Sequence, residues 1–295
     1  MEISYSYPLY RPPSEANSMI FQVTLGCSFN KCSFCNMYRT KQYLERPWED
    51  LKVEIDLAAK AYPQTRRIFL ADGDALNVST DRLIQVLDYI YSKFSNLQRV
   101  SCYAMPKNLL QKTDIELGEL KAAGLGMLYI GIESGSDIVL KKVTKGATSK
   151  AIVQGCQKAK GNGFLLSCMI ILGLGGRTYS NIHIHDTARI VSEIAPNYLA
   201  VLTLNLENEI YEEFMTKFGE PFVPLEDIEL LDELEGLISH LDLDLTKPII
   251  FRANHASSIY PLTGTLPQDK ENVLSLIRGL RSHPEMLKPK IFRKF

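Results

Sequence analysis

The sequence predicts an α/β fold with mostly parallel strands, because short apolar runs alternate with longer amphipathic patterns along most of the chain. The apolar runs have the length and residue content of strands, and they span 19–25, 66–71, 98–104, 126–132, 165–173 and 198–205. Helical spacing of apolar residues marks 48–61, 80–94, the stretch with Leu117, Leu120 and Leu125, 149–162 and 180–194. Six such units favour a partial (β/α)6 barrel of the TIM type, with a doubly wound sheet as the alternative.

The last third of the chain has a different pattern. Residues 205–227 lack a clear period and contain prolines, so we interpret them as a boundary region. A Leu-rich helix at 228–240, a strand, an irregular loop and a closing helix at 269–282 are expected beyond it. We therefore expect a core barrel with its N-terminal arm at 1–205, and a C-terminal α/β extension at 206–295 that caps the barrel.

Composition excludes several classes of protein. The chain has 295 residues, of which 45% are hydrophobic, so it has enough apolar material for a full core. Its formal net charge is −1, so nucleic acid is not indicated as a partner. The first residues contain no signal-peptide core, and no apolar run reaches the roughly 18 residues of a membrane span. We expect a cytoplasmic protein without a membrane partner.

Three of the six cysteines, Cys27, Cys32 and Cys35, lie within nine residues directly after the first predicted strand. In a reducing compartment such a group indicates a metal, and thiolates suit zinc or an iron–sulfur cluster. A structural zinc site needs four ligands, and no second pair of Cys or His follows nearby. An iron–sulfur cluster is therefore favoured, while structural zinc and an inert loop stay open.

The other three cysteines stand alone in the sequence. Cys102 and Cys168 fall in predicted strands, and Cys156 in a predicted helix. We interpret all three as packing residues, because a buried free cysteine behaves as a small hydrophobe. A second cluster is the alternative.

The segment QVTLGCSFNKCSFCNMY resembles the radical SAM superfamily, which carries three cysteines after its first strand. The family's usual gaps are three and two residues, whereas here the first gap is four and the second is two. An aromatic residue just before the last cysteine is typical of the family, and Phe34 occupies that place. The resemblance implies a [4Fe–4S] cluster on Cys27, Cys32 and Cys35, with one iron open to S-adenosylmethionine (SAM).

Two further segments resemble SAM-binding parts of the family. After the second strand, LADGDAL loosely resembles a Gly-Gly-Glu segment that meets the amino group of SAM. The matching positions are Ala71, Asp72, Gly73 and Asp74, and a simple turn is the alternative. The fifth strand ends in MIILGLGGRT, which resembles the family's Gly-x-Ile-x-Gly element beside the adenine. Its candidates are Gly173, through close backbone approach, and Arg177, for an anionic partner.

The segment YIGIESGSDIVLKKVTKG after the fourth strand resembles the branch that contains the oxygen-independent coproporphyrinogen oxidases. In that branch an acid or amide binds the ribose hydroxyls, and a cation twelve residues later pairs with the SAM carboxylate. Glu133 and Lys145 have this spacing, with Lys in place of the more common Arg. The alternatives are a strand-end carboxylate and a solvated loop charge.

The resemblance implies reductive cleavage of SAM to a 5′-deoxyadenosyl radical that abstracts hydrogen from a substrate, with flavodoxin or ferredoxin as electron donor. His255 and Tyr260 in the tail are the candidates for substrate contact. His183 and His185 do not share a helix face, so at least one should lie on the surface. A zinc-stabilised α/β binding protein is the competing class. A closed-shell SAM methyltransferase is disfavoured, because cysteines stand where its glycine-rich loop belongs.

Overall fold

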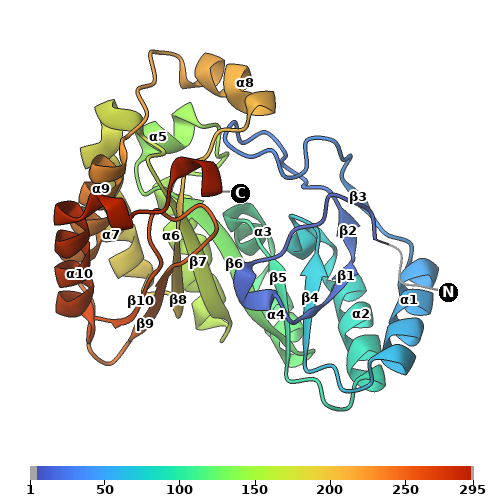
Figure 1. The fold of residues 1–295 in the computed structure, drawn as a ribbon. Helices are drawn as coiled ribbons and strands as arrows, with labels where there is room; N and C mark the ends of the chain where they lie inside the picture. The colour runs from blue at the N-terminus through green and yellow to red at the C-terminus, as the bar shows by residue number, and fades with distance from the viewer. Residues whose placement is uncertain (1–4, 294–295) are drawn as a thin grey trace. The chain divides into compact units, whose positions relative to one another are not determined.

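The computed structural model describes residues 5–293 and divides the chain into two compact units. The first unit contains Met1–Asn30, Met37–Ile130 and Gln154–Leu166, and the second contains Lys31–Asn36, Gly131–Val153 and Ser167–Phe295. The chain thus passes from one unit to the other more than once (Figure 1). The expected boundary near residue 205 separates a core from an extension, and it stays a prediction.

In the first unit, four parallel strands follow the order β1-β4-β5-β6. They are β1 (Met19–Gln22), β4 (Arg67–Ala71), β5 (Arg99–Tyr103) and β6 (Leu125–Glu133), and β6 ends in the second unit. A short antiparallel pair, β2 (Thr24–Leu25) and β3 (Leu44–Glu45), flanks the cysteine loop. Because the strands are parallel, the turns after β1 and β4 lie at the same edge.

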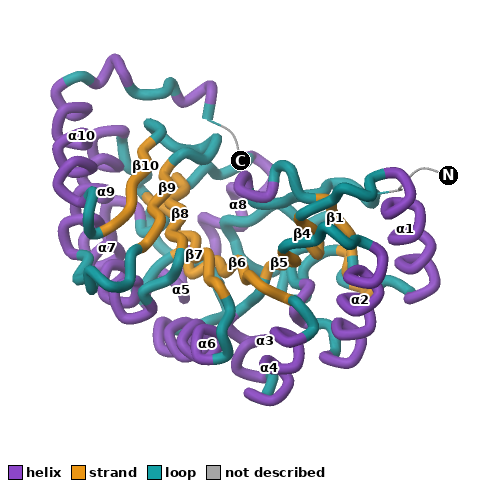
Figure 2. The backbone as a smooth tube through the Cα atoms, turned by 90° about the horizontal axis from the view of Figure 1, so that it is seen from below, coloured by secondary structure: helices purple, strands orange, loops and turns teal. Residues whose placement is uncertain are grey.

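The helices of the first unit lie against these strands (Figure 2), and α1 and α2 each bury one apolar face. Helix α1 buries Leu51 and Ile55, and α2 buries Leu83 and Leu87, while most of their charged residues are exposed. This burial is the main stabilising term of such helices. The helices are α1 (Trp48–Ala61), α2 (Thr80–Lys93), α3 (Pro106–Gln111), α4 (Asp114–Ala122) and α6 (Ser149–Gly161), which begins in the second unit.

The strands of the second unit follow the order β7-β8-β9-β10. Strands β7 (Leu165–Leu172), β8 (Tyr198–Thr203) and β9 (Ile249–Ala253) are parallel, and β10 (Leu262–Leu266) is antiparallel to β9. Helix α9 packs between α7 and α10. The helices are α5 (Asp137–Lys142), α7 (Gly176–Ile194), α8 (Asn208–Phe218), α9 (Asp227–His240) and α10 (Lys270–Ser282).

The six predicted strands are confirmed, with shifts of one or two residues at most ends, and β1 and β2 divide the first of them. Leu125, which the helical spacing included, instead begins β6. The interpretation of 205–227 as irregular is wrong in part, because Ile210, Phe214 and Phe218 form the buried stripe of α8. The prediction of an irregular loop is wrong for Leu262–Leu266, which form β10. This segment has only two large apolar residues, so its sequence did not indicate a strand.

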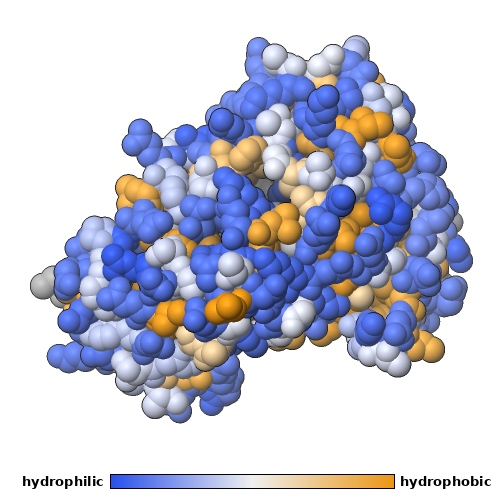
Figure 3. All heavy atoms as spheres, turned by 180° about the vertical axis from the view of Figure 1, so that it is seen from behind, coloured by the Kyte–Doolittle hydropathy of each residue, from blue (hydrophilic) through white to orange (hydrophobic). Residues whose placement is uncertain are grey.

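Hydrophilic side chains cover most of the face seen in Figure 3, and hydrophobic ones appear there in small groups. Within residues 5–293, no helix combines the length and the apolar character that crossing a membrane requires.

Candidate functional site

In the first unit, the turn after β4 lies against the start of the cysteine loop. The Gly73 N–H donates to the Gly26 carbonyl at 3.1 Å, and the Ser28 hydroxyl donates to the Asp74 carboxylate. A Cβ atom at Gly73 would lie 2.5 Å from Tyr38 Cε2 and 3.2 Å from Cys27 Cβ. Glycine at this position therefore permits the close approach of the two loops.

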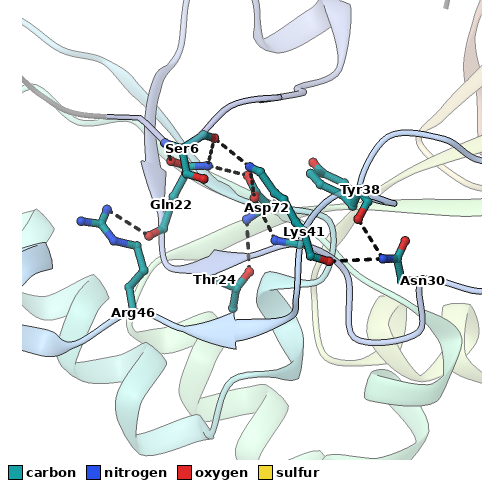
Figure 4. A network of polar contacts seen from close by, with 9 residues as sticks. Ser6, Gln22, Thr24, Asn30, Tyr38, Lys41, Arg46 and Asp72 are labelled. Atoms are coloured by element: carbon teal, nitrogen blue, oxygen red, sulfur yellow. Dashed lines mark hydrogen bonds and ion pairs between the residues drawn. The ribbon is translucent and has the colours of Figure 1, made fainter.

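The carboxylate of Asp72 joins the two ends of the cysteine loop (Figure 4). Its Oδ2 accepts from the Gly26 N–H at 2.9 Å and from Lys41 Nζ at 2.8 Å, and its Oδ1 accepts from Gln22 Nε2 at 2.9 Å. Asp72 is fully buried, and Lys41 nearly so. The side chain of Asp72 thus binds protein groups, while its predicted role in SAM binding concerns the backbone of Ala71–Asp74.

Asp74 has an unusual proton affinity. Burial raises the pKa of its carboxyl to about 6, although hydrogen bonds with Ser28 and Asn108 act in the opposite direction. Ala71, which precedes this turn, is also fully buried at the end of β4. Ala71, Asp72 and Asp74 are therefore shielded from solvent, and the segment lies beside Cys27 and Ser28.

In the second unit, Cys32 and Cys35 form a turn in which the Cys35 N–H donates to the Cys32 carbonyl at 3.2 Å. Ser33 fixes the turn, because its N–H and hydroxyl both donate to the Val143 carbonyl, at 3.0 and 3.2 Å. Cys32 Sγ lies 4.0 Å from the carbonyl oxygen of Lys145. The segment that follows α5 therefore holds the second half of the cysteine loop.

The structure brings together two of the predicted SAM-binding residues. Lys145 Nζ pairs with Glu133 Oε1 at 2.9 Å, and both side chains are largely buried. Glu133 ends β6 with φ at +58°, a left-handed conformation that is costly for this residue type and common at functional sites. Burial lowers the pKa of Lys145, but the charges of Glu133, Cys32 and Cys35 raise it to about 12. Lys145 therefore stays positive beside two thiols.

The glycine segment after β7 is held by a buried acid that sequence reasoning missed. The Gly173 N–H donates to Glu233 Oε2 at 2.6 Å, with Gly173 at φ +78°. Burial raises the pKa of Glu233 to about 7, against the hydrogen bonds of Gly173 and Ser180. Glu233 has helical spacing with Leu230 and Leu237 on the buried face of α9. This spacing could have predicted a buried acid, and a buried acid needs a hydrogen-bond partner.

Arg177 lies on the surface of α7. It makes a bidentate pair with Glu229, with Nε–Oε1 at 2.6 Å and the second bond at 2.8 Å, and its side chain is 54% exposed. The pair with Glu229 occupies the Nε–Nη2 edge of the guanidinium, which an anionic ligand would use.

The two tail candidates lie in the loop between β9 and β10. His255 Nδ1 accepts from the Ser257 N–H at 3.1 Å, and the Thr203 N–H donates to the Ser257 hydroxyl at 3.1 Å. Burial, with a smaller effect of Lys288, lowers the pKa of His255. Tyr260 is half-buried in the same loop. The loop is thus fixed to the end of β8 through Ser257.

The expectation for the helix histidines is confirmed. His183 is fully buried between the Ser134 hydroxyl at 2.8 Å and the Ile171 carbonyl at 3.0 Å, whereas His185 is exposed. Burial lowers the pKa of His183 to about 4, so its imidazole is neutral and structural.

The donor set fits a thiolate-bound metal group. Cys27, Cys32 and Cys35 are half-buried and form no disulfide, and Lys145 supplies positive charge near the last two, as is typical of ligand cysteines. The three isolated cysteines are fully buried, as expected of packing residues. Within residues 5–293, no three His, Cys, Asp or Glu side chains already converge as a formed metal site.

The mostly parallel α/β fold and the three-cysteine loop define an iron–sulfur protein. The chain belongs to the radical SAM superfamily, whose family model matches residues 21–188. Membership implies a [4Fe–4S] cluster and SAM as cofactors, together with a reductant.

Comparison with individual proteins agrees. The heme chaperone HemW of Bacillus subtilis is 25% identical over 174 residues, covering 58% of this chain and 45% of HemW. Coproporphyrinogen III oxidase (HemN) from Escherichia coli gives a TM-score of 0.55 at 17% identity, covering 75% of this chain and 51% of that one. Methylornithine synthase (PylB) gives 0.53 at 16%, covering 77% and 63%. These likenesses show the α/β fold with its mostly parallel strands, consistent with the partial barrel of radical SAM enzymes. The chain spans less than half the length of the curated relatives it matches.

Proposed function

We propose that this chain cleaves SAM reductively on a [4Fe–4S] cluster and uses the product to remove a hydrogen atom from a substrate. The observation that carries the proposal is the buried Glu133–Lys145 pair, which lies beside Cys32 and Cys35. The bound cluster and SAM supply the electron transfer and the radical chemistry. The residues of this chain supply the ligands, the orientation of SAM and the exclusion of water.

Cys27, Cys32 and Cys35 are the proposed cluster ligands, and Phe34 is buried in an apolar cluster against which Cys32 and Cys35 pack. Three thiolates from one short loop match the number of protein ligands that leave one iron of the cluster open. Lys145, which stays protonated, adds a positive charge near Cys32 and Cys35. A cation there stabilises thiolate ligands and attracts a carboxylate.

Glu133 and Lys145 are the proposed contacts for the ribose hydroxyls and the carboxylate of SAM. Lysine has three N–H donors, and Glu133 Oε1 accepts one of them, so the pair need not break when a second carboxylate arrives. The carboxylate of Glu133 likewise has lone pairs for hydroxyl donors. The ion pair therefore holds the side chains of Glu133 and Lys145 in position before SAM binds.

The remaining assignments follow the motifs. The backbone of Ala71–Asp74 is proposed for the amino group of SAM, the Gly173 backbone for the adenine, and Arg177 for an anionic group after release from Glu229. His255 and Tyr260 are proposed for the substrate. Flavodoxin or ferredoxin is the proposed electron donor, and the cytoplasm is the proposed location.

The test measures SAM binding by the reconstituted protein in variants of Glu133 and Lys145. Glu133→Ala should keep its iron content and lose SAM affinity, and Lys145→Met should lose affinity that Lys145→Arg restores. Lys141→Met, an exposed lysine on α5, is the matched control and should bind SAM as the wild type does. Unchanged SAM binding in Glu133→Ala would reject the ribose assignment.

A further inference from the structure

Helix α8 lies outside the segment that the family model matches, yet it packs directly on the cysteine loop. Phe214 and Phe218 of α8 are buried in one apolar cluster with Phe34, which directly precedes Cys35. Cys32 and Cys35 pack against the same cluster. In Figure 1, α8 lies beside α5, the helix that precedes Lys145.

The aromatic residues of this cluster form a closely packed group. The ring centroids of Phe214 and Phe218 are 5.6 Å apart in a stacked arrangement. Phe222, just beyond the helix, meets each of these two rings edge-on at 4.9 Å. Offset and edge-to-face pairs add to the stabilisation from burial. The three rings therefore pack tightly in or against the apolar cluster that contains Phe34.

Polar contacts fasten α8 to both ends of the Cys32–Cys35 turn. Lys217 Nζ donates to the Lys31 carbonyl at 3.0 Å, and Asn36 Nδ2 donates to the Glu207 carboxylate at 2.5 Å. Lys31 directly precedes the turn and Asn36 directly follows it. The side chains of Lys217 in α8 and of Glu207, directly before α8, therefore bind the two ends of the turn.

The C-terminal end of α8 is also held. Lys142 Nζ donates to the Phe218 carbonyl at 3.0 Å and pairs with Glu220 at 2.5 Å. A cation at this end satisfies a free carbonyl and favours the helix dipole. The Tyr179 hydroxyl donates to the same Glu220 at 2.5 Å. These contacts fix the position of Phe218 against the turn.

We propose that α8 is a cover for the cysteine loop, in which Phe214 and Phe218 are positioning residues that act through Phe34. The cover keeps Cys32 and Cys35 in an apolar, water-poor setting and fixes the direction of their thiols. An apolar shell of this kind controls solvent access to a metal group. The inference rests on the proposed function for the role of these thiols, but its test needs no cluster.

The test measures how fast iodoacetamide alkylates each cysteine in the reduced, metal-free chain, followed by peptide mass spectrometry. In Phe218→Ala, Cys32 and Cys35 should react about tenfold faster than in the wild type, because loss of a buried ring favours local opening. The matched control is Tyr211→Ala, which removes an aromatic ring that is 49% exposed on the same helix and should leave both rates unchanged. Cys27, which belongs to the other unit, is the internal reference.

Alkylation of the fully buried cysteines in Phe218→Ala would show that this variant unfolds. In that case Lys217→Met provides the test instead. This variant removes the bond to Lys31 with little effect on the core, and it should raise the rates of Cys32 and Cys35 alone. Unchanged rates at these two cysteines in a folded Phe218→Ala protein, or in Lys217→Met, would overturn the cover. After reconstitution, the visible absorbance of the cluster should decay faster in air in Phe218→Ala than in Tyr211→Ala. If the wild-type protein formed no cluster, the proposed function would be rejected. The alkylation result would still apply, because it is measured on the metal-free chain.

Discussion

Replacement of Gly73 by alanine tests the packing of the turn after β4 on the cysteine loop. The new Cβ would lie 2.5 Å from Tyr38 Cε2 and 2.8 Å from Cδ2, whereas carbon atoms prefer about 3.5–4.0 Å. The buried Tyr38 ring must therefore move by roughly 1 Å, or the turn must move away from Cys27. Overpacking of this kind costs about 1–3 kcal/mol, which exceeds the ~0.4–1 kcal/mol gained from a less flexible unfolded chain.

The assay is urea denaturation of the metal-free chain, followed by iron analysis after reconstitution. We expect Gly73→Ala to unfold at lower urea and to hold less iron, because the displaced Tyr38 and Cys27 lie in the same contact. The matched control is Gly279→Ala in α10, where an added Cβ meets no atom within 4 Å. That change should stabilise the chain by about 0.5–1 kcal/mol. Equal gains in stability for both variants would refute the reasoning.

Three further changes have expected results. The pKa of Glu233 is raised from 4.5 to about 7, so the folded state binds its proton more tightly and loses stability as pH rises between these values. Glu233→Gln, which keeps an acceptor for Gly173, should remove that loss, on the order of 3 kcal/mol, in denaturation curves at pH 5 and 8. Lys145→Met should cost about 3–5 kcal/mol by leaving Glu133 buried and unpaired, and a smaller cost in the double variant with Glu133→Gln would establish the pair. Arg177→Ala should change the free energy of unfolding by less than about 1 kcal/mol, since its ion pair is exposed, and a larger change in thermal unfolding would contradict this.

Local patterns in the sequence predicted most of the core fold. Strands such as β4 and β7 are short apolar runs, and α1 and α2 bury the apolar stripes that their spacing indicates. The cysteine loop was equally visible, because its three thiols are close neighbours in the chain. Features that depend on neighbouring residues were therefore accessible without a structure.

Features that depend on distant partners were not. Asp72 was expected to contribute its backbone, but its side chain joins Gly26 and Lys41, and no local pattern links these residues. The acid at Glu233 has meaning only beside the Gly173 N–H, which is sixty residues away in sequence. Helix α8 escaped notice because glutamates and nearby prolines mask its apolar stripe. Burial and tertiary hydrogen bonds decide such sites, and the linear pattern does not contain them.

The most direct test of the central claim is anaerobic reconstitution with iron and sulfide. EPR spectra would then be recorded with dithionite, with and without SAM, and 5′-deoxyadenosine would be assayed. The account predicts a reducible [4Fe–4S] signal that SAM perturbs, release of 5′-deoxyadenosine, and loss of both in Cys32→Ala. Stoichiometric zinc with no reducible cluster and no cleavage of SAM would contradict it.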